Sequence, residues 1–415
     1  MKRADSYRFY LAASAANGFL FATATTVNLV YMVEVAHLDP LQMVLVGTVL
    51  ELSVFLFEIP TGVVADTVGR RRSVVIGHLL TGVSFIVLVS WPSFGTILLA
   101  QVIWGVGWTF ISGAYPAWLT DEIGVPRANQ AFMSAAQLGQ AASFFGIGAA
   151  IAFAHTSLRL PMFAAGLGYL ALGVAMALLM EETGFQPRRD ERNGWRQMAA
   201  TVRAGTGEVR VKPLLAFILA FTVIYGMFSE GLDRLYTPYI IERFELPAIG
   251  PLGSVTWWGI IAAVGSLAAL AATSIARRYV DTDDDRALAL GLTVLTGGIG
   301  GAVIVFANID LFLGVLAFYW LASALRAARG PLALAWVNRH IPSHARATML
   351  SVYGQADSIG QVAGGPIVGF VAKQVSIGLA LSVFAVVLIA TLPLYAAAAR
   401  RGEKTSAARC RQRDP

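Results

Sequence analysis

Ionisable side chains inside long apolar segments are the residues of this chain whose types could do chemistry. They include four acids and three arginines, namely Glu51, Glu230, Asp233, Asp357, Arg234, Arg326 and Arg329. If the segments span a membrane, each charge is costly there, and such groups are usually paired or used to move protons and ions. The expected chemistry is therefore proton binding and the exchange of ion-pair partners.

Two of the acids are the main proton-coupling candidates. Glu51 is the deepest acid of the first half, and Glu230 is the deepest in the seventh apolar segment. Neither has a base at matching depth in its own segment, because Arg234 lies one turn further along. Removal from water favours the neutral form of a carboxyl group, and a group that binds and releases a proton near neutral pH needs this effect. The alternative to a proton site is a carboxyl group with a structural hydrogen bond to a nearby hydroxyl. Asp233 is a third candidate, although a pair with a neighbouring helix is its simplest interpretation.

The arginines are expected to be held in buried ion pairs. Arg326 and Arg329 lie one turn apart and therefore on the same face of a helix. Arg326 and Asp357 lie at the same depth of neighbouring segments, which predicts an ion pair between them, either a fixed strut or a switch. Arg234 belongs to the same set of ion-pair candidates.

A charged stretch, G-V-V-A-D-T-V-G-R-R-R over residues 62–72, separates the second and third apolar segments. Gly62 and Gly69 are expected to let the chain turn in a short loop. Asp66 lies between them and is expected to be paired with one of the arginines that follow, Arg70, Arg71 and Arg72. Glu58, one helical turn before the stretch, is interpreted as a structural partner for Arg70 or for nearby backbone.

This stretch resembles the signature of the major facilitator superfamily, G-x-x-x-D-R/K-x-G-R-R-R/K, between the second and third helices of that family. Six positions match, and Thr67 stands where the family usually has a base. The resemblance implies a secondary transporter in which this stretch forms part of a gate on the cytoplasmic side.

Composition supports an integral membrane protein of the all-α class. The 415 residues are 56% hydrophobic and 13% charged, against about 25% charged in ordinary soluble domains. Apolar segments of about 20 residues can cross a bilayer, and a dozen such segments are expected here. The single cysteine, Cys410, excludes a disulfide framework. We find no phosphate-binding loop and no metal-spaced histidine cluster, so neither an enzyme nor a cofactor or metal is expected.

Two six-helix halves are expected, over 1–180 and 213–399, with a cytoplasmic linker at 181–212 and a cytoplasmic tail at 400–415. The twelve transmembrane helices are predicted at 8–33, 41–64, 73–91, 94–120, 128–153, 160–180, 213–240, 252–276, 287–307, 310–336, 347–372 and 376–399. An imperfect repeat supports the halves, because Ala117-Trp118 and Gly139-Gln140 recur as Ala335-Trp336 and Gly360-Gln361.

The distribution of basic residues predicts the orientation. Most of the 31 Lys and Arg fall on one side of the predicted helices if both termini are cytoplasmic, in accord with the positive-inside rule. The net charge of +6 therefore indicates topology and anionic lipid headgroups rather than nucleic acid. The expected location is the inner (plasma) membrane, as a multi-pass protein.

The resemblance also implies where a substrate would bind. Helices 1, 4, 7 and 10 line the central cavity in this family, which implies as cavity candidates Asn17, Trp104, Trp108, Tyr225, Tyr319 and Trp320, with Gln137 on helix 5. Trp104 and Trp108 share one helical face. Flat aromatic walls suit partly apolar or cationic ligands, although packing and interface anchoring are common roles for such residues.

We expect proton-coupled efflux of a small amphipathic compound by a monomer that works by alternating access. Two departures from family patterns count against drug export, because Gln101 replaces a helix-4 arginine and the helix-5 Gly-Pro signature is missing. Nutrient uptake by proton symport and a membrane sensor without transport activity are the alternatives.

Overall fold

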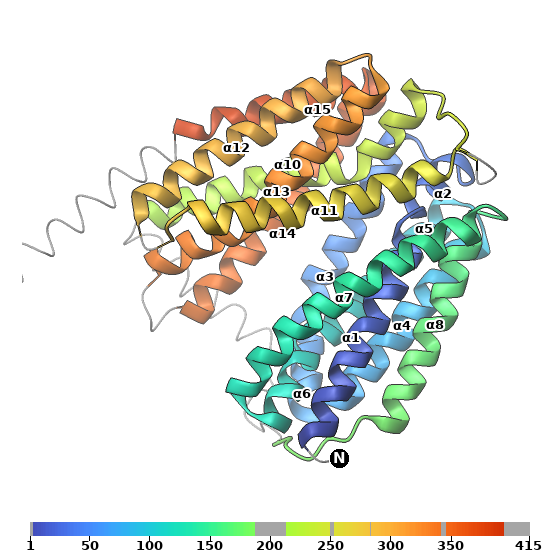
Figure 1. Cartoon of the computed structure of the whole chain (residues 1–415), viewed down its shortest axis with the longest axis vertical. Coiled ribbons are helices and arrows are strands. Elements are labelled where there is room, and N and C mark those ends of the chain that lie inside the picture. Colours follow the sequence, from blue (N-terminus) through green and yellow to red (C-terminus); the bar gives the residue numbers. More distant parts are fainter. Residues whose placement is uncertain (1–2, 187–212, 250–252, 283, 342–345, 394–415) are drawn as a thin grey trace, which may run out of the picture. The chain divides into compact units, whose positions relative to one another are not determined.

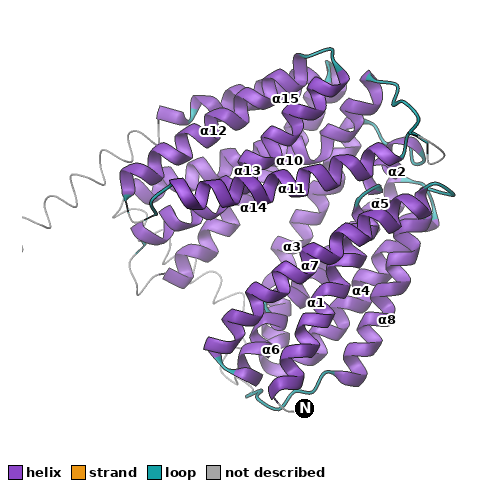
Figure 2. Cartoon of the chain, viewed as in Figure 1, coloured by secondary structure: helices purple, strands orange, loops and turns teal. Residues whose placement is uncertain are grey.

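The structure, a computed structural model, describes residues 3–186, 213–249, 253–282, 284–341 and 346–393. Over these residues the chain is helical throughout and contains no strand (Figures 1 and 2). The helices are α1 (Arg3–Thr25), α2 (Asn28–Glu34), α3 (Pro40–Val68), α4 (Arg70–Ser90), α5 (Phe94–Ser112), α6 (Ala114–Ile123), α7 (Val125–Ala154), α8 (Leu160–Leu179), α10 (Pro213–Arg243), α11 (Thr256–Tyr279), α12 (Asp285–Asn308), α13 (Phe312–His340), α14 (Arg346–Gln374) and α15 (Ile377–Ala390).

Short polar signals start several of these helices. Asp39 and Gln42 form a reciprocal capping box at the start of α3, with Pro40 in the first turn. Ser93 and Ser376 accept hydrogen bonds from backbone N–H groups in the first turns of α5 and α15. These caps satisfy backbone donors that the helix itself leaves without partners.

Ten segments of the described chain are long and apolar enough to cross a membrane. Two of them contain a break that we did not predict. The first expected helix is interrupted between α1 and α2, and the fourth is interrupted at Gly113 between α5 and α6. The eleventh expected helix is α14, which is 29 residues long but carries polar residues at its centre. The twelfth is α15, of which 14 residues are described.

The chain divides into two compact units. The first comprises residues 1–198 and 245–263, and the second comprises residues 199–244 and 264–415. The division between them therefore passes through α11. Most of the expected linker and the whole expected tail, including Cys410, lie outside the described residues.

In the first unit, α1 packs along α7, and α4 packs against α5 and α8. Glycines make the contact of α1 with α7 unusually close. A Cβ atom on Gly18 would lie within 3.0 Å of the carbonyl oxygen of Gly139, and one on Gly146 would lie equally close to that of Phe19. Small residues allow membrane helices to approach closely enough for backbone contact.

In the second unit, α10 packs along α14 in the same way. A Cβ atom on Gly360 would lie within 3.0 Å of the Val223 carbonyl oxygen, and one on Gly226 within 3.0 Å of that of Asp357. Gly139 and Gly360 are the two glycines that occupy equivalent positions in the sequence repeat. The repeated motif therefore makes the same kind of helix contact in each unit.

We predict that Gly146→Ala destabilises the protein by about 1–3 kcal/mol, because the added methyl group forces α1 and α7 apart. The matched control is Gly148→Ala on the same helix, where a Cβ would meet no atom within 4 Å. Thermal unfolding of the purified protein in detergent measures both variants. Equal melting temperatures for the two variants would contradict the close contact.

Candidate functional site

The charged stretch after the second span forms an ion-pair network in the first unit. Arg70 Nε lies 2.7 Å from a carboxylate oxygen of Asp121 at the end of α6, and Arg70 Nη1 lies 3.5 Å from Asp66. The pairing of Asp66 is thus confirmed. The arginine holds the end of α3, the start of α4 and the end of α6 together.

A second carboxylate caps α4. Glu182 accepts hydrogen bonds from the backbone N–H groups of Arg70 and Arg71, at 2.6 and 3.1 Å. A carboxylate is favourable at a helix N-terminus, where N–H groups lack partners and the helix dipole is positive. Gly69, the residue before α4, has a φ of 135°. A Cβ atom on Gly69 would lie 2.9 Å from Glu182 Oε2. The backbone conformation therefore favours glycine, whereas the end of the Glu182 side chain could shift to admit a Cβ atom.

The segment that contains Glu182 is itself fastened at several points. Glu122 accepts hydrogen bonds from the backbone N–H groups of Thr183 and Gly184, at 2.6 and 2.7 Å. Trp118 Nε1 donates to the Glu181 carbonyl oxygen at 2.8 Å. The Arg71 guanidinium donates to the Ala177 carbonyl oxygen near the end of α8. The start of α4 is thus tied to both α6 and α8.

Two expectations about this stretch were wrong, and one of the two alternatives for Glu58, the pair with Arg70, is not found. Residues 62–68 are not a loop, because they continue α3 until Gly69. Gly62 therefore makes no turn, and a Cβ there would meet no atom within 4 Å. The ion pairs of Arg70 within the described chain are with Asp66 and Asp121 instead of Glu58, which lines the same small pocket. Arg72 is exposed.

A cavity of about 450 Å³ opens in the first unit between α1, α4, α5, α6, α7 and α8. Asn17, Trp104 and Trp108, which the resemblance implied, lie in its wall. Further aromatic rings come from Tyr10, Phe21, Phe132, Tyr115 and Tyr169. Ser14, Ser112 and Gln140 add uncharged polar groups, and no Asp, Glu, Lys or Arg is among the lining residues in the described part of the chain.

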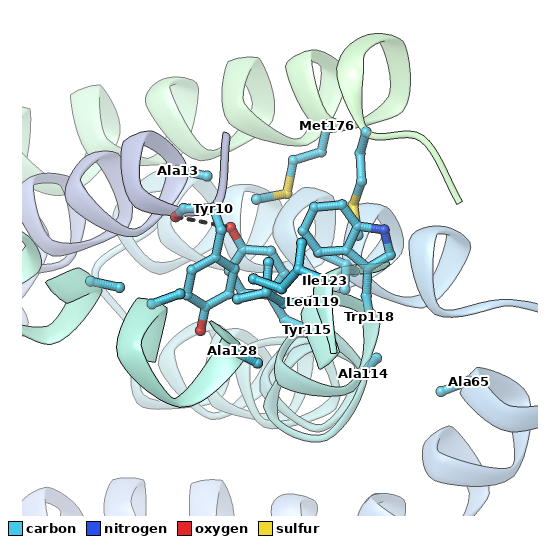
Figure 3. Close-up of a cluster of buried hydrophobic side chains, with 14 residues drawn as sticks. Tyr10, Ala13, Ala65, Ala114, Tyr115, Trp118, Leu119, Ile123, Ala128 and Met176 are labelled. Carbon is cyan, nitrogen blue, oxygen red and sulfur yellow. Dashed lines mark hydrogen bonds between the residues drawn. The ribbon is translucent and has the colours of Figure 1, made fainter. Parts of the chain in front are cut away.

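His78 is a wall residue that sequence reasoning missed. It is 2% exposed on α4, and its Nδ1 lies 2.8 Å from the Val74 carbonyl oxygen. The rings of Tyr115 and Tyr169 flank the imidazole at 6.3 and 6.2 Å. Their hydroxyl groups donate elsewhere, to the Tyr10 carbonyl oxygen (Figure 3) and to Asn17.

Part of the cavity wall belongs to a packed aromatic cluster. Tyr115 stacks against Trp118 at 6.0 Å and meets the ring of Tyr10 in a tilted contact at 4.5 Å, and Met176 packs in the same cluster (Figure 3). Because Trp118 also donates to Glu181, the cluster connects the cavity wall with the segment that caps α4.

In the second unit the expected charged residues form different pairs from those predicted. Arg326 donates from both terminal nitrogens to the two carboxylate oxygens of Asp233, at 2.6 and 2.7 Å. The predicted Arg326–Asp357 pair was therefore wrong, and Asp357 instead accepts from Gln361 Nε2 at 2.9 Å. Equal depth alone did not identify the partner, because Asp233 on α10 also faces α13.

Glu230 has a cation that sequence reasoning placed too far away. Arg234 Nε lies 3.1 Å from Glu230 Oε1, one turn along α10, and Glu230 is 2% exposed. Its partner is thus a residue of its own helix, which corrects the expectation that Glu230 lacks a nearby base. Glu51 is half-buried on α3.

The remaining candidates of the second unit make aromatic contacts. The Arg329 guanidinium lies over the ring of Tyr225 at 3.6 Å and near Phe221 at 4.8 Å, which gives it two cation–π contacts. Tyr319 stacks on Tyr236 at 4.5 Å, and Trp320 is half-buried beside it on α13. In the first unit, Gln137 is exposed and is not a wall residue of the cavity, whereas Gln140 is.

Two signals in the sequence could have identified the missed residues. His78 is an ionisable group inside an apolar segment, the same criterion that selected Glu51 and Glu230. Asp121-Glu122 and Glu181-Glu182 are acidic pairs that end apolar segments on the side of the arginine triplet. Their complementary charge was a reason to expect contact.

These features define a multi-pass helical membrane protein with a cavity and an ion-pair network in its first unit. The sequence matches the family model of the Major Facilitator Superfamily over residues 10–282, and the chain belongs to this superfamily of membrane transporters. A relative, the uncharacterized MFS-type transporter YxaM of Bacillus subtilis (strain 168), is 24% identical over 388 residues, which cover 92% of this chain and 93% of the relative.

Solved structures share the fold. The nucleoside transporter NupG superimposes with a TM-score of 0.76 at 11% identity, covering 95% of this chain and 98% of the other. A POT family transporter in complex with a thioalcohol conjugated peptide gives 0.76 at 13% identity, with coverage of 95% and 96%. A bacterial homolog of the human lysosomal transporter Spinster gives 0.68 at 13%, with coverage of 96% and 95%.

We predict that Arg70→Gln lowers stability by about 1–3 kcal/mol, because two carboxylates that are partly buried lose their shared cation. Arg72→Gln, in the same triplet, is the matched control and should change stability by less than about 0.5 kcal/mol. Melting temperatures in detergent compare the two variants. Equal losses would show that the triplet acts only through its overall charge.

A double-mutant cycle tests the pairing of Arg326. Asp233→Asn and Arg326→Gln should be coupled by about 1 kcal/mol, because each residue holds the other and Asp233 is partly exposed. The cycle of Asp357→Asn with Arg326→Gln is the control and should show additive effects. Unfolding in detergent gives the coupling energy of each cycle. A larger coupling energy for Arg326 with Asp357 than with Asp233 would favour the Arg326–Asp357 pair that the sequence predicted.

Proposed function

We propose that this transporter exports a small amphipathic compound in exchange for protons, by alternating access in the plasma membrane with both termini in the cytoplasm. One observation carries the proposal, namely the cavity of about 450 Å³ with aromatic and uncharged polar walls. Pockets of about 300–1,000 Å³ suit drug-sized molecules. A wall with rings and a few polar groups favours a ligand that is partly apolar.

Glu230 is the proposed proton carrier. It is buried and paired with Arg234, so a proton on its carboxylate would remove the negative charge and leave the arginine without that partner. The loss of an ion-pair partner at membrane depth is costly, so the surroundings of Arg234 are expected to change when Glu230 takes up a proton. Proton binding and a rearrangement of α10 are coupled by this cost.

The position of Glu230 supports a link to movement of neighbouring helices. Asp233, three residues further along α10, holds Arg326 on α13 by two hydrogen bonds. A change at the Glu230–Arg234 pair therefore acts next to an interhelical ion pair. Glu51 on α3 is the second candidate for the proton site.

The network around Arg70 is the proposed latch on the cytoplasmic side. It contains two carboxylates that share one arginine, together with the cap on α4 by Glu182. Such a cluster has several partners of similar strength, and ion pairs of this kind can be exchanged between two states of a transporter. Asp66→Asn is expected to impair transport while membrane insertion remains intact.

The proposal is tested first by a growth screen. Cells that express the protein are grown against a panel of toxic amphipathic compounds and on a panel of sole nutrients, with cells carrying an empty vector as control. Export predicts resistance to at least one toxic compound. Growth on a new nutrient would indicate uptake instead, and no change of growth in either panel, with no substrate-dependent proton flux, would favour a membrane sensor.

For a compound that passes the screen, we predict that Glu230→Gln abolishes uphill transport driven by a pH gradient but retains binding and downhill exchange. The measurement is accumulation in proteoliposomes with and without an imposed gradient. Glu242→Gln, at the exposed end of the same helix, is the matched control and should accumulate substrate normally. If Glu230→Gln and Glu51→Gln both still concentrate the compound, proton coupling through these acids is wrong.

A further inference from the structure

The cavity of the first unit contains an imidazole that no part of the proposed transport cycle has used. His78 lies eight residues after the start of α4, about 12 Å along the helix at 1.5 Å per residue. It belongs to the wall of the 450 Å³ cavity together with Tyr115 and Tyr169, whose rings flank it. All of these residues belong to one compact unit.

The hydrogen bond of His78 determines which of its nitrogens can meet a ligand. Nδ1 lies 2.8 Å from the Val74 carbonyl oxygen, which can only accept, so Nδ1 carries the proton in this bond. In a neutral imidazole the other nitrogen, Nε2, is then an acceptor. Within the described chain His78 makes this hydrogen bond alone, so Nε2 is the atom that remains for a molecule in the cavity.

Neighbouring hydroxyl groups do not supply the missing donor. Tyr115 donates to the Tyr10 carbonyl oxygen at 3.4 Å, and Tyr169 donates to Asn17 Oδ1 at 3.1 Å. Thr81 donates to the Gly77 carbonyl oxygen at 2.9 Å. The wall therefore uses these hydroxyl protons internally, and a ligand must bring its own N–H or O–H group to His78.

The charge of the wall restricts the ligand further. Among the described residues that line the cavity there is no Asp, Glu, Lys or Arg, and an ion bound there would give up its hydration without a counter-charge from them. The rings of Tyr10, Phe21, Trp104 and Trp108 instead offer flat apolar surface for stacking. The site thus combines aromatic walls, the acceptor nitrogen of His78 and a few uncharged polar groups, among them Ser112 and Gln140.

We propose that this cavity binds a neutral, planar aromatic molecule that donates a hydrogen bond to Nε2 of His78. The proposal names the class of substrate that the exporter would carry, and this part of it rests on the proposed function. As a binding site, however, it can be tested on the purified protein without any transport.

Four probes with the same naphthalene ring and nearly the same shape separate the alternatives. They are 2-naphthamide, which is neutral and donates; 2-acetylnaphthalene, which is neutral and does not donate; 2-naphthoate, an anion; and 2-naphthamidine, a cation. Calorimetric titration of the protein in lipid nanodiscs, corrected with empty nanodiscs, measures each affinity. The amide should bind, about 3- to 10-fold more tightly than the ketone, which is the effect of one neutral hydrogen bond.

Two substitutions of His78 test the role of Nε2. In His78→Gln the terminal amide oxygen can replace Nε2 as acceptor, and binding of 2-naphthamide should stay within about twofold. His78→Asn reaches only to the position of Nδ1, and the amide should lose its advantage over the ketone. His155→Asn, at the exposed end of α7, is the matched control and should bind as the unchanged protein does.

The probe comparison keeps the proposal falsifiable even if His78→Asn fails to fold. Equal binding of amide and ketone, or no binding of 2-naphthamide up to its solubility limit, would overturn it. Tightest binding of 2-naphthamidine would show that the rings form a cation site instead. Binding as proposed without proton-linked transport would leave this site standing and reject the exporter, whereas proton-linked export with no binding of the amide would do the reverse.

Discussion

Backbone contact between pairs of helices is the constraint on which the other features of each unit depend. Lipid tails are as apolar as leucine, so burial of apolar side chains gives membrane helices little reason to associate. Here glycines bring α1 against α7, and α10 against α14, until there is no room for a Cβ atom between them. Gly18 and Gly139, which form the first contact, also lie in the wall of the cavity. The contact therefore determines where the aromatic side chains of both helices face each other.

The two units differ in how they use charge. In the first unit the ion pairs gather around the start of α4, where Arg70 joins Asp66 and Asp121 and Glu182 caps the helix. The described residues that line the cavity of that unit include no Asp, Glu, Lys or Arg. In the second unit two ion pairs lie along the helices, Glu230–Arg234 inside α10 and Asp233–Arg326 between α10 and α13, and two others lie at helix ends. A neutral ligand site and a proton-responsive site are thus chemically compatible with different units of one chain.

Helix ends link the charged network to the cavity. Trp118 donates to Glu181, one residue before the carboxylate that caps α4, and its ring stacks on Tyr115. Tyr115 in turn flanks His78. A ligand that displaces the rings around His78 would press on the same cluster that holds the cap. Coupling between the proposed binding site and the proposed latch requires physical contact of this kind. The variants of His78 test the binding site, and the variants of Arg70 test the ion-pair network.

The sequence by itself determined the membrane class, the helical architecture and the charged stretch at the start of α4, because apolar length and the glycine–arginine spacing are local properties. It also indicated the repeat, since Gly139 and Gly360 recur in similar surroundings. Partners of charged groups were decided only by the tertiary structure. Depth along the helices made Asp357 a possible partner of Arg326. In the structure Arg326 instead pairs with Asp233, because the side chains of these two residues face each other. Likewise, only the packing of α4 against its neighbours places His78 in the cavity wall, because helical position does not say which face of a fully apolar helix meets the protein interior.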